Sequence, residues 1–477
     1  MKRYELLAEE IAQSIRTGVM KLGDRLPSVR QASTSRGVSP STVFEAYYLL
    51  EARGLIRARE RSGYYVIAGA KTLPPEPDIA SRPTGESTTV DVSRLVFDVL
   101  ESVKTRDIVP LGSAFPSPLL FPLPRLARSM ASCVQEMDPW STVDDLTPGN
   151  AGLRRQIALR YLADGLHLHT DEIVITNGAL EALNLCLQAV ARPGDCVIIE
   201  SPTFYAALQA LERIGLNAIE VPTHPREGID LAALALALER HKPKACWLMT
   251  NFQNPLGSLM PDEKKRALVE LLESHDVPLI EDDVYGELYF GAKRPVSAKA
   301  FDTKGLVMHC SSFSKCLAPG YRIGWAAPGR FTQEVARLKV TITLSASAPA
   351  QAALADYLAK GGYDKHLRQL RHALSVQQSA MIQAVVRHFP KGTKATRPNG
   401  GYFLWIELPG NANALEIHRQ ALSLGISVAP GPMFSAQRGF TNCLRLNYGH
   451  PWDARTDEAL ATLGRIIAAN MEGRAVA

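Results

Sequence analysis

A lysine embedded among small and hydroxyl residues is the feature of this sequence best suited to chemistry. Lys315 lies in the run SSFSKC, which begins at Ser311, and Arg322 follows seven residues after the lysine. A buried lysine can form a Schiff base with an aldehyde, and pyridoxal phosphate is the biological aldehyde that uses a protein lysine in this way. The hydroxyls of Ser312 and Ser314 and the guanidinium of Arg322 would then face a phosphate. The alternative is an ordinary surface lysine in a serine-rich loop.

Three further motifs lie where strand-like runs end. Gly178 and Ala179 open a helical run, and the N–H groups at such a helix start can bind a phosphate at close approach. Phe204 follows a strand-like run and could stack on a flat ring. Asp282 could keep a pyridine nitrogen protonated, whereas its neighbour Asp283 is expected to be solvated or to cap a helix. Each motif alone is also typical of an ordinary strand–helix junction or core.

A late arginine falls inside an apolar strand pattern. Arg445 lies in the run CLRLN, where an unpaired charge would be costly. A ligand carboxylate, bound by both arms of the guanidinium, would compensate that charge. An internal ion pair is the alternative.

Strand-like and helical runs alternate in the region that carries these motifs. The strand-like runs are residues 173–176, 197–200, 245–249, 279–281 and 306–309. This alternation predicts an α/β fold with a mostly parallel sheet and helices on both faces. Ligands of such sheets bind beyond the carboxyl ends of the strands, where the motifs lie.

Together with the run NPLG at Asn254, these motifs resemble those of fold-type-I aminotransferases across residues 108–477. The resemblance implies pyridoxal phosphate on Lys315, with Asn254 and Tyr285 bonded to its phenolic oxygen and Phe204 in the stacking position. It also implies a large cofactor domain, residues 91–342, and a C-terminal α+β small domain, residues 343–477. Such chains often carry a Tyr that reaches the partner subunit's phosphate, but the segment around Asp145 has none.

The first 67 residues predict a small DNA-binding domain. A helix with apolar positions at Leu7 and Ile11 is followed by a second helix, 29–35, behind Ser28, and by a third, 40–52, capped by Ser39. Residues 55–66 then predict a β-hairpin with a basic tip. The segment carries 11 Lys/Arg against 7 Asp/Glu, a net charge of +4, whereas the remaining 410 residues carry 42 against 41. A segment with this net positive charge is typical of domains that bind a polyanion such as DNA.

This helix–turn–helix with a basic hairpin predicts a winged helix–turn–helix. The runs GDRLPSVRQ, GVSPSTVFEAYYLLEARGLI and RSGYYV resemble the GntR-type DNA-binding domain over its whole length. The resemblance implies double-stranded operator DNA as a partner, contacted through Arg30, Ser41, Thr42 and Gly63. Arg59 and Arg61, in the hairpin, are expected to contact phosphates, although a solvated hairpin face is the alternative.

The composition of the chain indicates where its domains are joined and in which compartment it is expected. Residues 68–90, which include LPPEPDIASRPTGEST, predict an extended linker, and an amphipathic helix should follow.

Seven cysteines without paired spacing favour a reducing cytoplasm over disulfides or a metal site. No apolar run approaches the roughly 20 residues that cross a bilayer, so no membrane association is expected. The N-terminus has charges within its apolar pattern, which predicts an amphipathic helix and not a signal peptide.

Head and body together resemble the MocR-type subfamily of GntR regulators, which carry an aminotransferase-like domain. The resemblance implies a homodimer in which Lys315 holds pyridoxal phosphate and a small amino compound acts as effector. Two alternatives remain open from the sequence. One is a working aminotransferase with an attached DNA-binding head, since every part needed for transamination is present. The other is a DNA-binding protein that senses pyridoxal phosphate itself.

Overall fold

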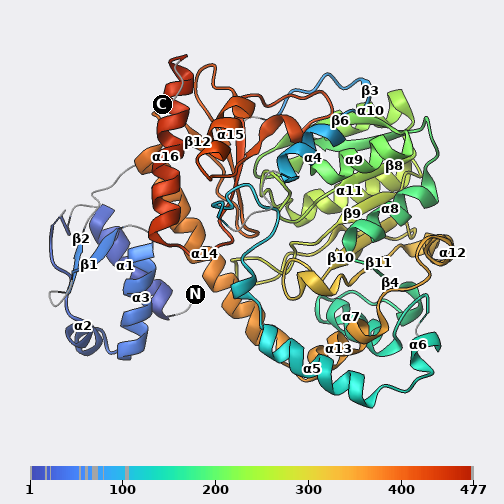
Figure 1. Cartoon of the computed structure of the whole chain (residues 1–477), viewed down its shortest axis with the longest axis horizontal. Helices are drawn as coiled ribbons and strands as arrows, with labels where there is room; N and C mark the ends of the chain where they lie inside the picture. The colour runs from blue at the N-terminus through green and yellow to red at the C-terminus, as the bar shows by residue number, and fades with distance from the viewer. Residues whose placement is uncertain are drawn as a thin grey trace.

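The structure, a computed structural model, describes residues 3–16, 19–21, 23–52, 55–59, 63–66, 73–78, 80–101, 107–144 and 146–473. Figure 1 shows a small N-terminal head beside a much larger body, next to helices from the C-terminal part of the chain. Across these described ranges, no helix is long and apolar enough to cross a membrane.

Three helices and a hairpin form the head. They are α1 (Arg3–Arg16), α2 (Val29–Arg36), α3 (Pro40–Ala52), β1 (Ile56–Arg59) and β2 (Gly63–Val66). Both serines that were expected to cap helices do so. The Oγ atom of Ser28 accepts from the N–H of Gln31 at 3.2 Å, and that of Ser39 accepts from the N–H of Thr42 at 3.2 Å. The predicted winged helix–turn–helix is therefore confirmed.

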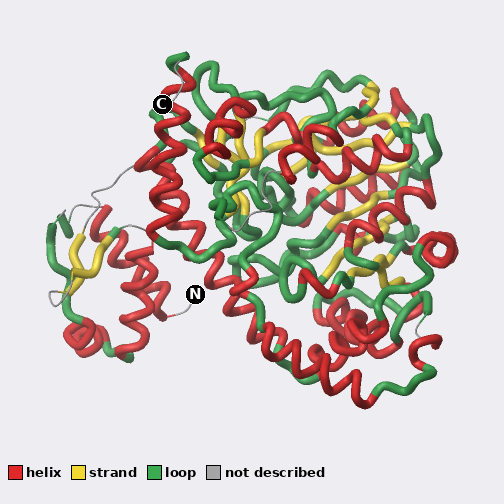
Figure 2. The backbone as a smooth tube through the Cα atoms, viewed as in Figure 1, coloured by secondary structure: helices red, strands yellow, loops and turns green. Residues whose placement is uncertain are grey.

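A nine-stranded sheet forms the centre of the body, in the order β3-β6-β5-β8-β9-β10-β11-β4 with β7 paired to β6. Figure 2 shows these strands running through the body between helices. The pairs from β6 to β10 in this order are parallel, whereas β3, β7, β11 and β4 pair antiparallel. The strands are β3 (Ser87–Thr89), β4 (Val174–Thr176), β5 (Cys196–Ser201), β6 (Asn217–His224), β7 (Gly228–Ile229), β8 (Ala245–Leu248), β9 (Leu279–Asp282), β10 (Val307–Ser312) and β11 (Gly324–Ala327).

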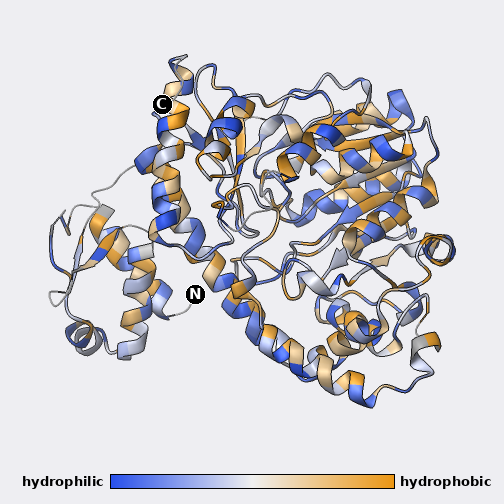
Figure 3. Cartoon of the chain, in the orientation of Figure 1, coloured by the Kyte–Doolittle hydropathy of each residue, from blue (hydrophilic) through white to orange (hydrophobic). Residues whose placement is uncertain are grey.

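The sheet is covered on both faces because its strands are apolar on both sides. In β5, Val197 and Ile199 belong to the main core, which includes α8 (Ala179–Val190) and α9 (Tyr205–Ile214). Ile198, between them, belongs to a second core with α10 (Leu231–His241) and α11 (Asp262–Ser274). Alternate side chains of a strand point to opposite faces, so two helical layers result. Figure 3 shows the apolar strands between these helices.

The remaining helices flank the sheet and lead into the C-terminal part. They are α4 (Ser93–Glu101), α5 (Leu123–Glu136), α6 (Ser141–Asp144), α7 (Ala151–Ala163), α12 (Thr332–Ile342), α13 (Ala348–Ala359), α14 (Tyr363–His388), α15 (Ala414–Ser423) and α16 (Ala454–Met471). α13 packs against α5 and α7, and α14 packs against α16.

A separate antiparallel sheet of four strands lies in the C-terminal part, in the order β12-β13-β15-β14. Its strands are β12 (Lys394–Ala395), β13 (Phe403–Glu407), β14 (Ala429–Pro430) and β15 (Cys443–Asn447). The predicted combination of a mostly parallel sheet and a C-terminal α+β unit is confirmed. Four strands of the large sheet, β3, β6, β7 and β11, were not predicted. β3 and β7 have only three and two residues, β6 contains Pro222, and β11 has one bulky residue, so none of them shows a strand pattern.

The described part of the predicted linker is extended, but it is attached to the body. Strand β3 pairs with β6, and the carbonyl of Pro75 accepts from the N–H of Ala395 at 3.0 Å. The predicted amphipathic helix follows as α4, whose Val96 and Val99 are buried. These residues therefore extend the large sheet rather than forming a free tether.

Candidate functional site

The predicted site residues of the body gather at the carboxyl ends of the parallel strands. Asp282 is the last residue of β9, Ser312 is the last of β10, and Phe204 follows the end of β5 by three residues. Gly178 follows the end of β4 by two residues. The fold therefore assembles side chains that lie far apart in the sequence at one edge of the sheet.

Lys315 is partly buried in the loop after β10. Its Nζ atom donates to the carbonyl of Ala114 at 2.8 Å and lies 3.7 Å from the ring centroid of Phe115. Burial and, to a smaller extent, the nearby guanidinium of Arg445 lower the pKa of Lys315 to about 7, against the opposing effect of Asp282. With such a pKa, about half of the Lys315 side chain is a free amine at pH 7, and the free amine is the nucleophilic form.

A cradle for a phosphate lies where α8 begins. Gly178 precedes α8 with a φ of 82°, and a Cβ atom there would lie 2.4 Å from an Nη atom of Arg322. Only glycine fits this position, because it combines the conformation with the close approach. Arg322 Nη1 donates to Ser314 Oγ at 3.2 Å, and Ser312 Oγ accepts from the N–H of Ser314 at 3.3 Å. Helix N–H groups, hydroxyls and a guanidinium thus converge on one spot, as an anion requires.

Asp282 is buried and partly unpartnered. Its side chain is almost inaccessible, and its Oδ1 atom has no hydrogen-bond partner. Burial raises the pKa of Asp282 to about 7, with a further contribution from the carboxylate of Asp283, whereas Lys315 lowers it. A buried, unsatisfied carboxylate requires an explanation, and a cationic ring nitrogen would provide the missing partner.

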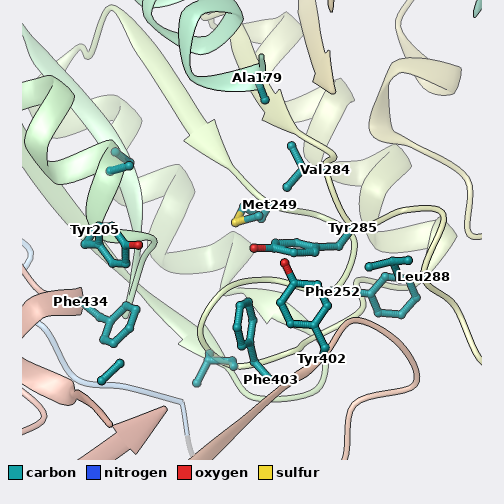
Figure 4. Packing of buried hydrophobic residues seen from close by; sticks show 14 of the residues in the cluster. Ala179, Tyr205, Met249, Phe252, Val284, Tyr285, Leu288, Tyr402, Phe403 and Phe434 are labelled. Atoms are coloured by element: carbon teal, nitrogen blue, oxygen red, sulfur yellow. The ribbon is translucent and has the colours of Figure 1, made fainter. Parts of the chain in front are cut away.

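Asn254 and Tyr285 flank the same region. Asn254 Oδ1 accepts from Arg445 at 3.1 Å, while its Nδ2 atom is buried and has no partner. Tyr285 is buried against Tyr402 and Phe403, with ring centroids 5.4 and 5.7 Å apart, and the hydroxyl of Tyr402 donates to the carbonyl of Ala114 at 3.0 Å. Figure 4 shows the hydroxyls of Tyr285 and Tyr402 directed toward one another. The free Asn254 amide supplies a donor for an oxygen of a ligand.

Arg445, on β15, is fully buried. Its Nη2 atom donates to the carbonyls of Gly112 and Ser113 at 2.7 and 3.1 Å, and its Nε atom has no partner. The guanidinium also lies 4.2 Å from the ring centroid of Phe403. Among the ion pairs of the described residues, none involves Arg445, so the predicted alternative of an internal ion pair is not found there. Among the described residues, the contacts of this charge are neutral: the Asn254 amide, the two carbonyls and the Phe403 ring.

Phe204 lies immediately before α9, and its ring packs against that of Tyr205 with centroids 4.7 Å apart. Sequence reasoning missed Tyr205, which is buried within hydrogen-bonding reach of Arg445. Its only sequence signal is its position beside Phe204.

Asp283 is neither solvated nor a helix cap, so that expectation was wrong. Its carboxylate is buried and accepts from Asn251 Nδ2, Arg294 Nη2 and His309 Nε2, each at 3.1 Å. Burial alone would raise the pKa of Asp283, but Arg294 and His309 hold it below its usual range. His309 Nδ1 in turn lies 2.6 Å from the hydroxyl of Tyr161. This network anchors the chain next to Asp282, and the local sequence gives no sign of it.

The head presents its predicted DNA-contacting residues to solvent. Arg30 on α2 and Ser41 at the start of α3 are exposed, and Thr42 is half-buried. Gly63 has a φ of 96°, and a Cβ atom there would lie 3.4 Å from Arg25. The side chain of Arg59 and the whole of Arg61 lie outside the described residues, as does Asp145 of the segment without a Tyr.

Comparisons with known proteins agree with both parts. The aminotransferase class I and II family model matches residues 121–463, and that of the gntR family of bacterial regulatory proteins matches residues 3–66. The uncharacterized HTH-type transcriptional regulator YdcR of Escherichia coli (strain K12) is 49% identical over 467 residues, covering 98% of this chain and 99% of its own.

Two solved aminotransferases resemble the body. The kynurenine aminotransferase of Pyrococcus horikoshii, in complex with PMP, has a TM-score of 0.72 at 30% identity and covers 78% of this chain and 94% of its own. LysN, an α-aminoadipate aminotransferase of Thermus thermophilus, complexed with N-(5′-phosphopyridoxyl)-L-leucine, has a TM-score of 0.69 at 30% identity and covers 80% of this chain and 99% of its own.

Pyridoxal phosphate is the cofactor that this family implies, and the buried groups fit it. The amine of Lys315, the cradle at Gly178, the orphaned Asp282 Oδ1 and the free Asn254 amide match the aldehyde, phosphate, ring nitrogen and phenolic oxygen of that molecule. The head matches the gntR-family model, and the relative that matches almost end to end is named an HTH-type transcriptional regulator. The chain therefore belongs to the MocR-type transcriptional regulators, in which a gntR-family head precedes an aminotransferase-like domain.

Proposed function

We propose that this transcriptional regulator binds pyridoxal phosphate covalently through Lys315 and senses a small amino compound that carries a carboxylate. The observation that carries the proposal is the guanidinium of Arg445, which is fully buried and held by neutral groups. A buried charge of this kind is costly unless a counter-charge arrives, and a ligand carboxylate is the natural one. Asn254, bonded to Arg445, places that carboxylate next to the cofactor.

Each predicted residue has a role in this proposal. Asp282 accepts from the protonated ring nitrogen, Phe204 stacks on the ring, and Asn254 and Tyr285 donate to its phenolic oxygen. The phosphate is held by Gly178, Ala179, Ser312, Ser314 and Arg322. When bound, pyridoxal phosphate supplies an aldehyde that joins to an amine and a ring that withdraws electrons from it. The Asp282 carboxylate keeps the ring nitrogen protonated, while Arg445 orients the amino compound toward the aldehyde.

The same proposal assigns the DNA and subunit contacts. Arg30, Ser41 and Thr42 enter the major groove with the start of α3, and Arg59, Arg61 and Gly63 bring the wing to the backbone or minor groove. A homodimer would cover apolar side chains that are exposed at the edge of the body, including Leu119, Trp140 and Leu344. The proposed units are residues 1–67, the linker 68–90, a large domain 91–342 and a small domain 343–477.

The rate of covalent loading should depend on pH around neutrality. Because burial lowers the pKa of Lys315 to about 7, its free amine should accumulate as pH rises through about 7 and not about 10.4. Absorbance after mixing cofactor-free protein with pyridoxal phosphate, from about pH 5 to about pH 9, gives this profile. Asp282→Asn should move the midpoint to lower pH, because the carboxylate of Asp282 raises the pKa of Lys315. A midpoint near pH 10 would contradict the environment described for Lys315.

Two kinds of head substitution should have different effects on DNA binding. Arg59→Ala should remove one phosphate contact, weaken binding to all sequences alike and reduce the slope of log affinity against log salt by about one. Ser41→Ala or Thr42→Ala should instead relax sequence preference. Fluorescence anisotropy at several salt concentrations, with selected and scrambled duplexes, measures both. Arg419→Ala, at an exposed position of α15, is the control and should leave the slope unchanged. If Ser41→Ala lost the same affinity for all duplexes, the role of Ser41 in sequence preference would be refuted.

A catalytically active aminotransferase is the second candidate function, because Lys315, Asp282 and Arg445 lie together as such an enzyme needs. Titration of the loaded protein with the common amino acids, followed by its visible spectrum, separates the candidates. A lasting spectral change that alters DNA affinity supports a sensor of amino compounds. Release of keto acid at about 1–1000 per second would make the protein an aminotransferase. A change of DNA affinity with pyridoxal phosphate alone, and with none of the amino acids, would make it a sensor of the cofactor.

A further inference from the structure

Helix α14 begins beside the cofactor lysine. Tyr363, its first residue, has its hydroxyl 3.0 Å from the Sγ atom of Cys316. One turn later, His366 Nε2 donates to the carbonyl of Cys316 at 2.7 Å. Cys316 is covalently next to Lys315, so the start of α14 is bonded directly to the backbone that carries the proposed cofactor attachment.

The same helix, α14, also contacts the head. The ring of His372 packs edge-on against Tyr4 of α1, with centroids 5.9 Å apart and its Nδ1 atom 3.4 Å from the hydroxyl of Tyr4. One turn further, Val376 is buried within the hydrophobic core of the head. His366 and His372 are six residues apart, so at 1.5 Å per residue the lysine contact and the head contact are separated by about 9 Å of helix. Figure 1 shows the head beside this helix.

The helix is continuous between these contacts, and other parts of the body hold it. α14 runs for 26 residues without a break, so a displacement at its start is passed along it by its backbone hydrogen bonds. Arg371 donates to the carbonyl of Glu287 at 3.2 Å, and Gln378 donates to the carbonyl of Pro398 at 2.6 Å. The helix therefore touches the large sheet region, the small domain and the head at once.

An open pocket lies beside the contact between head and body. It has a volume of about 470 Å³ and is lined by Tyr48 and Arg57 of the head and by Gln383 and Trp452 of the body. The pocket borders the later turns of α3, whereas Ser41, which is exposed, begins that helix. Docking therefore leaves the DNA-contacting end of α3 open.

We propose that α14 couples the state of Lys315 to the orientation of the DNA-binding head. This inference rests on the proposed function, because it requires that Lys315 bind the cofactor. The Nζ atom donates to Ala114 and lies over Phe115. Condensation of this amine with the aldehyde of the cofactor would form a carbon–nitrogen double bond, release the aldehyde oxygen as water and remove both contacts. The Lys315–Cys316 backbone then takes a new position, and His366 carries that change into α14. The contacts of His372 and Val376 transfer it to α1 and to the core of the head.

Hydrogen–deuterium exchange of the full chain, with and without pyridoxal phosphate, tests the coupling. In the wild type, loading should change exchange at the start of α14 and in α1 by about threefold or more. Gln369→Ala, at an exposed position of α14, is the matched control and should respond like the wild type. His372→Ala should retain the response at the start of α14 and lose that in α1. Tyr4→Ala removes the same contact from the head side and serves as a second variant if His372→Ala does not fold.

The outcomes separate this inference from the proposed function. Intact mass after borohydride reduction reports whether pyridoxal phosphate is attached to the chain. No attachment in the wild type overturns the proposed function, and this inference with it. Attachment without any change of exchange in α1 overturns the coupling alone. A response in α1 that survives in both His372→Ala and Tyr4→Ala also overturns the route through α14, while the proposed function stands.

Discussion

Lys315→Ala is expected to abolish covalent attachment of pyridoxal phosphate. Lys315 is a partly buried lysine beside the cradle at Gly178 and the unpartnered Oδ1 atom of Asp282, and burial lowers its pKa to about 7, so that about half of the amine is free at pH 7. The phosphate cradle remains in the variant, so the cofactor should still bind weakly and reversibly. Borohydride reduction followed by peptide mass spectrometry should place the adduct on the peptide that contains Lys315 in the wild type and find none in the variant.

The control is Lys365→Ala, which removes an exposed lysine from α14 and should load like the wild type. Absorbance in the visible range should report the same difference, since only the attached cofactor gives a band that survives dialysis. A reducible covalent adduct in Lys315→Ala, at any other lysine, would refute the assignment and every role that depends on it.

The elements and motifs that the sequence revealed depend on local chemistry. Ser28 and Ser39 cap their helices because capping requires only a side-chain oxygen and a nearby N–H. Gly178 was recognisable because a strand followed by a glycine and a helix forms an anion site from adjacent backbone groups. The parallel strands β5, β8, β9 and β10 were recognisable because burial on both faces makes them continuous apolar runs.

The features that the sequence concealed depend on distant partners. Asp283 was expected to be solvated, yet it pairs with Arg294 and with His309, which comes 26 residues later and is brought alongside by the pairing of β10 with β9. Arg445 was recognised by its apolar surroundings, but its partner Asn254 lies 191 residues away. No local pattern specifies such pairs, since they depend on how the chain packs. The same holds for α14, whose helical pattern gives no sign that it serves both the cofactor site and the head.

Arg445→Ala should abolish the response to the amino effector while leaving cofactor loading intact. The guanidinium is buried and can pair with a carboxylate through a charge-assisted bidentate contact. Loss of such a pair should cost about 2–3 kcal/mol, or about a hundredfold in effector affinity at about 1.4 kcal/mol per tenfold. Spectral titration of the loaded protein measures that affinity. Arg445→Lys retains the positive charge but not the two-armed guanidinium, so its effector affinity should lie between those of the wild type and of Arg445→Ala. Arg465→Ala, exposed on α16, is the control.

Basal DNA binding separates a local effect of Arg445→Ala from a general loss of structure. Arg445 lies in the body, and its partners are Asn254 and the carbonyls of Gly112 and Ser113, so the head should bind DNA as before. Unfolding would reduce DNA affinity and cofactor loading together, and the thermal midpoint would show it. Unchanged effector affinity in a folded Arg445→Ala variant would contradict the assigned role.

Rapid mixing of the loaded protein with the effector then decides between a sensor and an enzyme. A regulator needs its liganded state to last, because DNA affinity responds to the population of that state. We therefore expect the first spectral change to persist, with little or no release of keto acid. The segment around Asp145, which lacks a Tyr where aminotransferase-like chains often have one, favours slow turnover. Complete conversion within about a second, at ordinary enzyme rates of about 1–1000 per second, would show that the site turns over faster than a stable signal allows.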